Sequence, residues 1–228
     1  MRINGLATLL NYQGFVVVPR VVSEELLRQA EERLETLNVS GAGTRNLLEH
    51  EWCRSLAVFI RNHPSLSDCL QPTNVAVQCT YFDKSPLRNW RVAFHQDLAV
   101  PTARRSHHPE LGAWSEKEGQ LFVHAPVSLL TQLLAVRVHI DPATTYNGPL
   151  RLIPGTHSLG RLNPAQIQQA RETAQEVACT AQPGDVLLMR PLILHASSKG
   201  TVPVRRRVLH FLFAPPNPGF DIRWQYAA

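Results

Sequence analysis

Cysteine is scarce in this chain of 228 residues, and it is not arranged in pairs. The four cysteines, Cys53, Cys69, Cys79 and Cys179, show no CxxC spacing. This excludes a disulfide-rich secreted scaffold and argues against a zinc site of paired thiolates, because both need numerous or closely spaced cysteines. We interpret the four residues as small buried side chains in a reducing compartment, which predicts a cytoplasmic location.

Long apolar runs are also absent. The apolar patch at residues 6–10 is short and follows a single early arginine, so we expect neither a membrane span nor a signal peptide. No internal repeat or low-complexity linker divides the sequence, and 228 residues suffice for one well-packed core. We therefore expect a single domain over residues 1–228 with no membrane partner. No feature of the sequence predicts an oligomeric state.

Charged residues make up only 18% of the chain, with 23 lysines and arginines against 18 acidic residues and a formal net charge of +5. Such an excess can steer anionic ligands toward a protein, although a solvated basic surface is its commoner meaning. Basic residues do not alternate with aromatic ones, and no known nucleic-acid-binding module is present. We therefore expect no nucleic-acid partner.

The chain does contain a set of metal-ligand residues. His95-Gln96-Asp97 places a histidine and a carboxylate two positions apart, and His195 follows about a hundred residues later. Two imidazoles and one carboxylate can cap one face of Fe(II) and leave the opposite face open for a co-substrate and O2. Thiolates would instead favour zinc or an iron–sulfur cluster. The sequence therefore predicts a non-haem iron site at His95, Asp97 and His195.

Three consecutive arginines, Arg205, Arg206 and Arg207, open a later apolar run at residues 208–213. A 2-oxo acid that chelates iron through its keto-acid end needs a permanent cation for its far carboxylate, and arginine offers a planar fork. Because side chains alternate along a strand, Arg205 and Arg207 should face the side opposite Arg206, where one of them can pair with a surface carboxylate. A shift of the strand register by one residue would exchange these roles. Ser197 should share the side of His195 and could donate a further hydrogen bond.

Periodicity predicts mainly β structure with flanking helices. Helices are expected after the cap residue Ser23, over residues 51–62, and from Asn163-Pro164 to about residue 175. Many short strand-like runs follow residue 74, with turn signals between them. This pattern predicts a double-stranded β-helix, a cupin-like jelly roll, in which distant histidines can meet at one iron.

Residues 98–128 look less regular, with three prolines and two glycines. Long irregular connections in compact domains are usually functional or disordered. Because this segment leaves directly from the metal motif, we predict an active-site loop that acts as a lid or binds substrate.

Four sequence motifs resemble those of the phytanoyl-CoA dioxygenase family of Fe(II)/2-oxoglutarate oxygenases. They are His95-Gln96-Asp97, the stretch Asn147-Gly148-Pro149-Leu150 that continues to Pro154-Gly155-Thr156-His157, Gly184-Asp185 with its strand, and His195-Ala196-Ser197 with Arg206-Arg207-Val208. The opening Tyr12-Gln13-Gly14-Phe15 is also similar to the start of the family. The resemblance covers most of the chain.

The resemblance implies a dioxygenase that uses Fe(II), 2-oxoglutarate and O2 to hydroxylate a small molecule, with release of succinate and CO2. His95, Asp97 and His195 would bind iron, Arg206 and Ser197 would hold the distal carboxylate of 2-oxoglutarate, and Gln78 would contact the co-substrate. Asp97 argues against a halogenase, because halogenases of the family replace this carboxylate with a small residue. Gly200 departs from the family, whose members often have Asn in this turn. Nothing in the sequence marks a site for coenzyme A.

Two other functions remain as alternatives. One is a non-catalytic metal-binding jelly roll that serves as a sensor or scaffold, against which Arg206 and Ser197 argue. The other is nucleic-acid demethylation on a related fold, suggested by the basic charge. We interpret His139, His157 and His210 as core or turn residues. Arg45 is interpreted as part of a surface loop.

Overall fold

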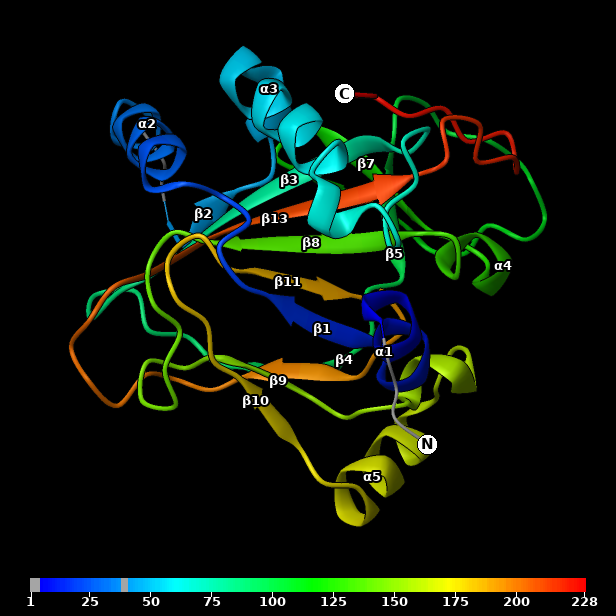
Figure 1. Cartoon of the computed structure of the whole chain (residues 1–228). Coiled ribbons are helices and arrows are strands. Elements are labelled where there is room, and N and C mark those ends of the chain that lie inside the picture. Colours follow the sequence, from blue (N-terminus) through cyan, green and yellow to red (C-terminus); the bar gives the residue numbers. More distant parts are fainter. Residues whose placement is uncertain (1–4, 38–40) are drawn as a thin grey trace.

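The computed structural model describes residues 5–37 and 41–228, and two antiparallel sheets face each other in it (Figure 1). The larger sheet has the strand order β1 (Phe15–Val18), β11 (Val186–Met189), β8 (Leu134–His139), β13 (Arg206–Ala214), β3 (Val75–Lys84), β2 (Gly43–Thr44). The smaller sheet has the order β10 (Val177–Cys179), β9 (Leu150–Leu152), β12 (His195–Ser197), β4 (Val92–His95). The predicted jelly roll is confirmed.

Alternation along β13 separates an apolar outer face of the larger sheet from a mixed inner face. Leu209, Phe211 and Phe213 are fully buried in the outer core. Arg206 and His210 instead line the cavity between the sheets. The fold therefore buries polar side chains on the face that looks toward the smaller sheet.

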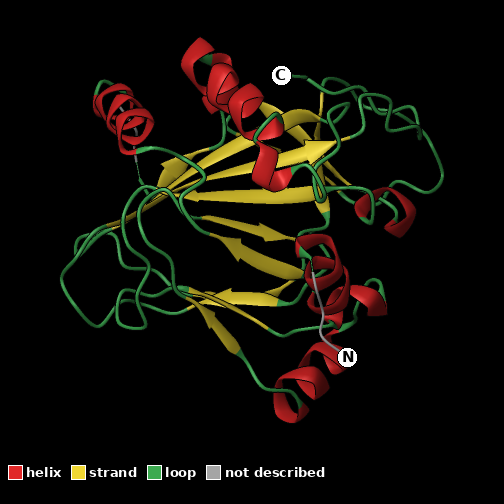
Figure 2. Ribbon diagram, viewed as in Figure 1, coloured by secondary structure: helices red, strands yellow, loops and turns green. Residues whose placement is uncertain are grey.

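Helices cover the outer face of the larger sheet. The ribbons of α2 (Glu24–Glu35) and α3 (Glu51–Arg61) lie over it, and their buried side chains join its core (Figure 2). Ser23 caps α2 as predicted, because its Oγ accepts from the amide of Leu26 at 3.3 Å. Leu27 is buried in this core, and the partly buried Leu26 packs against it.

Further helices lie around the two sheets. Asn163 forms a capping box at the start of α5, which confirms the predicted Asn-Pro start. These helices are α1 (Leu6–Gln13), α4 (Val127–Leu130) and α5 (Pro164–Thr173), together with the 3-10 helices η1 (Leu47–Glu49), η2 (Pro64–Leu66) and η3 (Thr156–Leu159). No helix in the described part of the chain is long and apolar enough to cross a membrane.

The turn before β11 requires glycine, as its Pro-Gly-Asp sequence suggests. Gly184 has a φ of 82°, and a Cβ there would lie 2.3 Å from the carbonyl oxygen of Val22. That close approach lets the carbonyl of Gly184 accept from the amides of Val21 and Val22, both at 3.0 Å. The turn thereby joins β11 to the segment that enters α2.

Residues 98–128 are more regular than expected. They form a third antiparallel sheet of β5 (Ala99–Thr102), β7 (Gln120–His124) and β6 (Trp114–Lys117). Val100 and Val123 are fully buried in the core between the sheets. The expectation of an irregular segment was wrong, because its prolines and short strands hid the alternation that packs one face inward.

Candidate metal centre and its pocket

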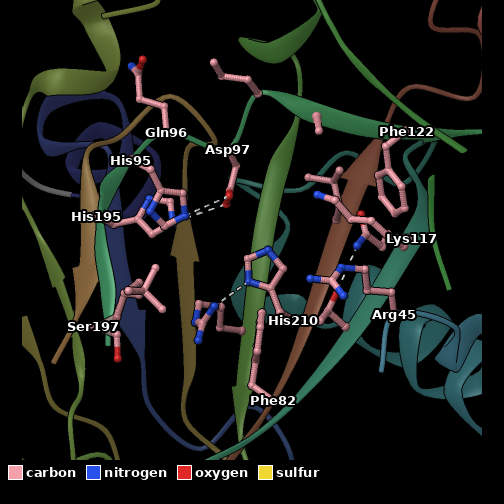
Figure 3. A pocket seen from close by; sticks show the side chains of 18 of the residues that line it. Arg45, Phe82, His95, Gln96, Asp97, Lys117, Phe122, His195, Ser197 and His210 are labelled. Atoms are coloured by element: carbon pink, nitrogen blue, oxygen red, sulfur yellow. Dashed lines mark hydrogen bonds and ion pairs between the residues drawn. The ribbon is translucent and has the colours of Figure 1, made fainter. Parts of the chain in front are cut away.

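The fold brings the two distant parts of the metal motif together at the edge of the smaller sheet. His95 ends β4, His195 begins β12, and the two residues are direct partners in the antiparallel pair. Asp97 follows β4, and its amide donates to the carbonyl of Pro191 at 2.9 Å. Figure 3 shows both imidazoles directed at the Asp97 carboxylate.

The donor atoms of this triad converge. Nε2 of His95 and Nε2 of His195 each lie 3.6 Å from an oxygen of Asp97. One donor atom from each residue lies within 4.8 Å of the others. Donors about 2.1 Å from one ion at right angles are roughly 3 Å apart, so small side-chain movements would complete such a site. The arrangement fits a two-histidine, one-carboxylate metal centre.

Hydrogen bonds fix the histidine tautomers. Nδ1 of His95 lies 2.8 Å from the carbonyl oxygen of Ala93, and Nδ1 of His195 lies 2.9 Å from that of Ile193. A carbonyl only accepts, so each Nδ1 carries the proton and each Nε2 keeps its lone pair. Both rings are therefore held ready to bind a cation through Nε2.

Gln96, between the two ligands, holds the motif in place. Its buried amide nitrogen donates to the carbonyls of Leu192 at 2.6 Å and Gly160 at 2.8 Å. Its carbonyl oxygen accepts from the amide of Leu162 at 2.8 Å. One side chain thus ties His95 and Asp97 to two other segments, a role that the sequence did not reveal.

The local charges favour a neutral histidine beside an ionised carboxylate. Burial lowers the pKa of His195 to about 4, although Asp97 acts in the opposite direction. Burial by itself would raise the pKa of Asp97, but His195, His210 and His95 outweigh it and lower that pKa. These are the protonation states that metal ligation requires.

The triad opens into a cavity of about 540 Å³ between the two sheets and the third sheet. All three predicted co-substrate residues, Gln78, Ser197 and Arg206, line it. Its other lining residues come from β3, β4, β8, β9, β13, the third sheet and the segment before η1, and are Arg45, Thr80, Phe82, Trp90, Val92, Gln96, Leu98, Ala99, Lys117, Phe122, His124, Arg137, Leu150, His210 and Leu212.

Arg206 is buried in this cavity without a partner among the described residues. Its side chain makes no hydrogen bond or ion pair there, and its Nε is a buried donor that remains unsatisfied. Burial lowers its pKa to about 10, so the group stays charged at neutral pH. Arg205 and Arg207 lie on the opposite side and pair with Asp83 and Asp141, both at 2.7 Å, as alternation predicted.

Lys84 is a site residue that the sequence analysis missed. It lies opposite Arg206 in the β3–β13 register and is 2% exposed. Its Nζ donates to Ser197 Oγ at 2.9 Å and to the carbonyl of Ser198 at 2.6 Å, while Ser197 Oγ donates to Gly148 at 3.0 Å. Burial and then Arg206 lower the pKa of Lys84 to about 8. The alternation of Gln78, Thr80 and Phe82 on β3 was the signal that could have found it.

Two other residues that line the cavity differ from the places that we expected for them from the sequence. His210, which we assigned to packing, lines the cavity and contacts Arg137 through Nδ1 at 2.8 Å. Arg45, which we placed in a surface loop, lines it too and pairs with Glu118 at 2.8 Å.

The other two histidines that we interpreted from the sequence, His139 and His157, behave as expected. His139 is buried with its Nδ1 3.3 Å from the carbonyl of Asp185. His157 contacts the carbonyl of Asn11 at 3.1 Å. Neither residue lines the cavity.

Several solved structures are similar to the chain in fold. The iron-bound EctD from S. alaskensis has a TM-score of 0.69 at 17% identity, over 96% of this chain and 78% of that one. The carbocyclase SnoK from nogalamycin biosynthesis has a TM-score of 0.64 at 19% identity, over 91% and 82%. HygX from Streptomyces hygroscopicus, with nickel and 2-oxoglutarate bound, has a TM-score of 0.63 at 15% identity, over 90% and 84%. These TM-scores establish a shared fold.

Sequence comparison identifies the family. No curated protein matches the chain in sequence. A family model described as phytanoyl-CoA dioxygenase (PhyH) matches residues 10–208, which is most of the chain. The predicted family and enzyme class are confirmed. The chain belongs to the phytanoyl-CoA dioxygenase family of Fe(II)- and 2-oxoglutarate-dependent dioxygenases.

Proposed function

We propose that this dioxygenase hydroxylates a small molecule in the cavity beside His95, Asp97 and His195 and releases succinate and CO2. One observation carries the assignment of residues. The buried and unpartnered Arg206 lies in the same cavity as the three convergent metal donors. A metal site that serves only as a sensor or scaffold has no use for such a cation, whereas the distal carboxylate of 2-oxoglutarate needs one.

His95, Asp97 and His195 hold Fe(II) in this proposal. The iron supplies a redox centre at which 2-oxoglutarate and O2 react, and this chemistry belongs to the cofactor. The protein contributes the position of the ligands. The carbonyls of Ala93 and Ile193 orient the two rings, and Gln96 holds the segment between the two nearer ligands.

Arg206 binds the distal carboxylate of 2-oxoglutarate, with Lys84 beside it. The two residues are direct partners across β3 and β13. Arg206 lines the cavity, and Lys84 lies behind that lining with its Nζ bonded to Ser197 Oγ and the carbonyl of Ser198. Ser197 Oγ already accepts from Lys84 and donates to Gly148, and its role is therefore to position Lys84. Gln78 donates to Thr80 at 2.8 Å and contributes to the cavity wall.

The segment 98–128 forms a wall of the active site in this proposal. Leu98, Ala99, Lys117, Phe122 and His124 from this segment line the cavity. A wall of this kind excludes bulk water from the metal centre and strengthens electrostatic contacts inside. In this role the segment acts as a lid or binds substrate.

Formation of succinate tests the proposed function. Purified protein is incubated with Fe(II), 2-oxoglutarate and O2, and succinate is measured with and without a panel of small molecules. We expect slow succinate formation that depends on iron, that a true substrate accelerates, and that Asp97→Ala abolishes. Iron that binds to the wild-type protein without any succinate formation would favour the non-catalytic alternative.

A further inference from the structure

The inner face of the larger sheet carries a second buried cation, Arg137 on β8. The residue is 6% exposed and lines the cavity with the metal triad. Its guanidinium lies 5.3 Å from the ring centre of Phe82, and its Nη1 contacts Nδ1 of His210 at 2.8 Å. The dashed line at His210 in Figure 3 marks this contact. Packing and a hydrogen bond thus fix the position of this group.

Arg137 has no carboxylate partner in the described part of the chain. Arg205, Arg207 and Arg151 each form an ion pair, whereas Arg137 forms none. Its Nε is a buried donor without a partner. Burial, followed by the nearby Arg206, lowers its pKa to about 10, so it stays charged at neutral pH. A buried cation without an anion is unfavourable, and this one is therefore suited to an anion that arrives with a ligand.

His210 adds a second donor to the same place. A guanidinium only donates, so Nδ1 of His210 must accept from Arg137, and the proton of the neutral ring lies on Nε2. Burial, together with Arg137, keeps the ring neutral by lowering its pKa to about 3. Its edge contact with Phe82, at 6.1 Å between ring centres, holds it in the cavity. Arg137 and His210 together offer N–H donors, with no free acceptor.

Along β13 this donor pair is offset from the anchor proposed for 2-oxoglutarate, although the charges of Arg137 and Arg206 are near enough for Arg206 to lower the pKa of Arg137. Arg206 and His210 face the same cavity four residues apart on β13, which is roughly 13 Å along a strand. His210 and Arg137 are direct partners in the β13–β8 register. The co-substrate uses its distal carboxylate at Arg206 and its keto-acid end at the metal. Arg137 and His210 are therefore left for another molecule.

We propose that Arg137 and His210 bind a carboxylate of the primary substrate, and that the enzyme accordingly acts on small carboxylic acids. The inference rests on the proposed function. Arg137 keeps guanidinium N–H donors beyond the one that binds His210, and such donors match the oxygens of a carboxylate, while the Nε2–H of His210 can supply a further bond. Lys117 lines the same cavity and adds to its positive charge. A bound carboxylate would place a neighbouring C–H bond close to the metal triad.

The test uses two matched probes, 4-fluorophenylacetate and its neutral amide. The wild-type enzyme is loaded with Fe(II) without oxygen and saturated with 2-oxoglutarate, and ¹⁹F NMR gives the dissociation constant of each probe. We expect the acid to bind at least about tenfold more tightly than the amide. The preference should disappear in Arg137→Gln, be partly kept in Arg137→Lys, and be reduced in His210→Phe. The melting temperature of Arg137→Gln should not fall, since a buried lone cation is removed.

Three results would overturn the inference. The wild-type enzyme could bind acid and amide equally, or neither, which would mean that it has no site for this anion. Arg137→Gln could keep the preference, which would place the carboxylate elsewhere. Arg137→Gln could weaken 2-oxoglutarate binding as strongly as Arg206→Gln, which would assign Arg137 to the co-substrate. Failure of the wild-type enzyme to bind 2-oxoglutarate at all would instead refute the proposed function, and it is measured first.

Discussion

Replacement of Arg206 by glutamine removes the cation proposed to hold 2-oxoglutarate while keeping a polar side chain. Loss of one partner from a buried, hydrogen-bonded charge pair costs about 2–5 kcal/mol, which is roughly a 30-fold to a few thousand-fold loss of affinity. Lys84 is the direct cross-strand partner of Arg206 and keeps a second positive charge near it. We therefore expect the KM for 2-oxoglutarate to rise toward the lower end of that range.

The stability of the protein without ligand separates this effect from misfolding. Arg206 has no partner among the described residues, so its replacement breaks no ion pair and removes a buried cation. The melting temperature of the Arg206→Gln variant should be equal to or above that of the wild-type protein. A loss of affinity in a folded variant then reports on the ligand site.

Arg205→Gln is the matched control, because this neighbour points to the other side and pairs with Asp83. Its KM for 2-oxoglutarate should remain within about threefold of wild type, since a partly exposed ion pair contributes about 1 kcal/mol or less. Succinate formation measured against 2-oxoglutarate concentration gives both values. Equal KM values for wild type and Arg206→Gln would refute the reasoning, as would an equal rise in the Arg205→Gln control.

Three further predictions concern residues around the site. The pKa of Lys84 is lowered to about 8, so this residue loses its charge as pH rises through that value. The wild-type protein should therefore bind 2-oxoglutarate more weakly above pH 8, whereas Lys84→Met should show no such pH step. Calorimetry from pH 6.5 to 9 would measure both. Gln96→Ala removes three hydrogen bonds behind the metal ligands. It should weaken metal binding about 10- to 100-fold, as measured by competition with a chelator. An unchanged metal affinity would contradict the positioning role of Gln96. The Glu118 carboxylate accepts hydrogen bonds from Thr44, from the Arg45 amide and from the Arg45 side chain. Glu118→Ala should therefore release the β6–β7 turn and speed limited proteolysis of this turn about tenfold. Equal proteolysis rates would mean that these contacts do not hold the wall.

The sequence predicted the part of the site that spacing encodes. The HxD motif and its distant histidine have a recognisable chemistry, and the alternation of Arg205, Arg206 and Arg207 predicted which of them faces inward. The strands on both sides of the jelly roll were also predicted, because runs of β-branched and apolar residues mark them.

Other features depend on contacts that spacing does not encode. Every residue of β8 is buried, so the sequence of that strand does not distinguish an inward Arg137 from an outward one. The contact between Arg137 and His210 depends on the pairing of strands that are distant in the chain. Alternation along β3 predicts the face on which Lys84 lies, but its position opposite Arg206 depends on the pairing of β3 with β13. The third sheet was missed because its strands are short, Pro101 lies within β5, and Pro109 lies between β5 and β6.

Anaerobic titration of the Fe(II)-loaded protein with 2-oxoglutarate tests whether the metal triad and Arg206 form one co-substrate site. We expect a weak visible charge-transfer band that saturates with 2-oxoglutarate, is absent in His195→Ala, and requires much more 2-oxoglutarate in Arg206→Gln. Iron bound at the triad without any such band would contradict this expectation, and the protein would then be a metal-binding jelly roll that does not use 2-oxoglutarate.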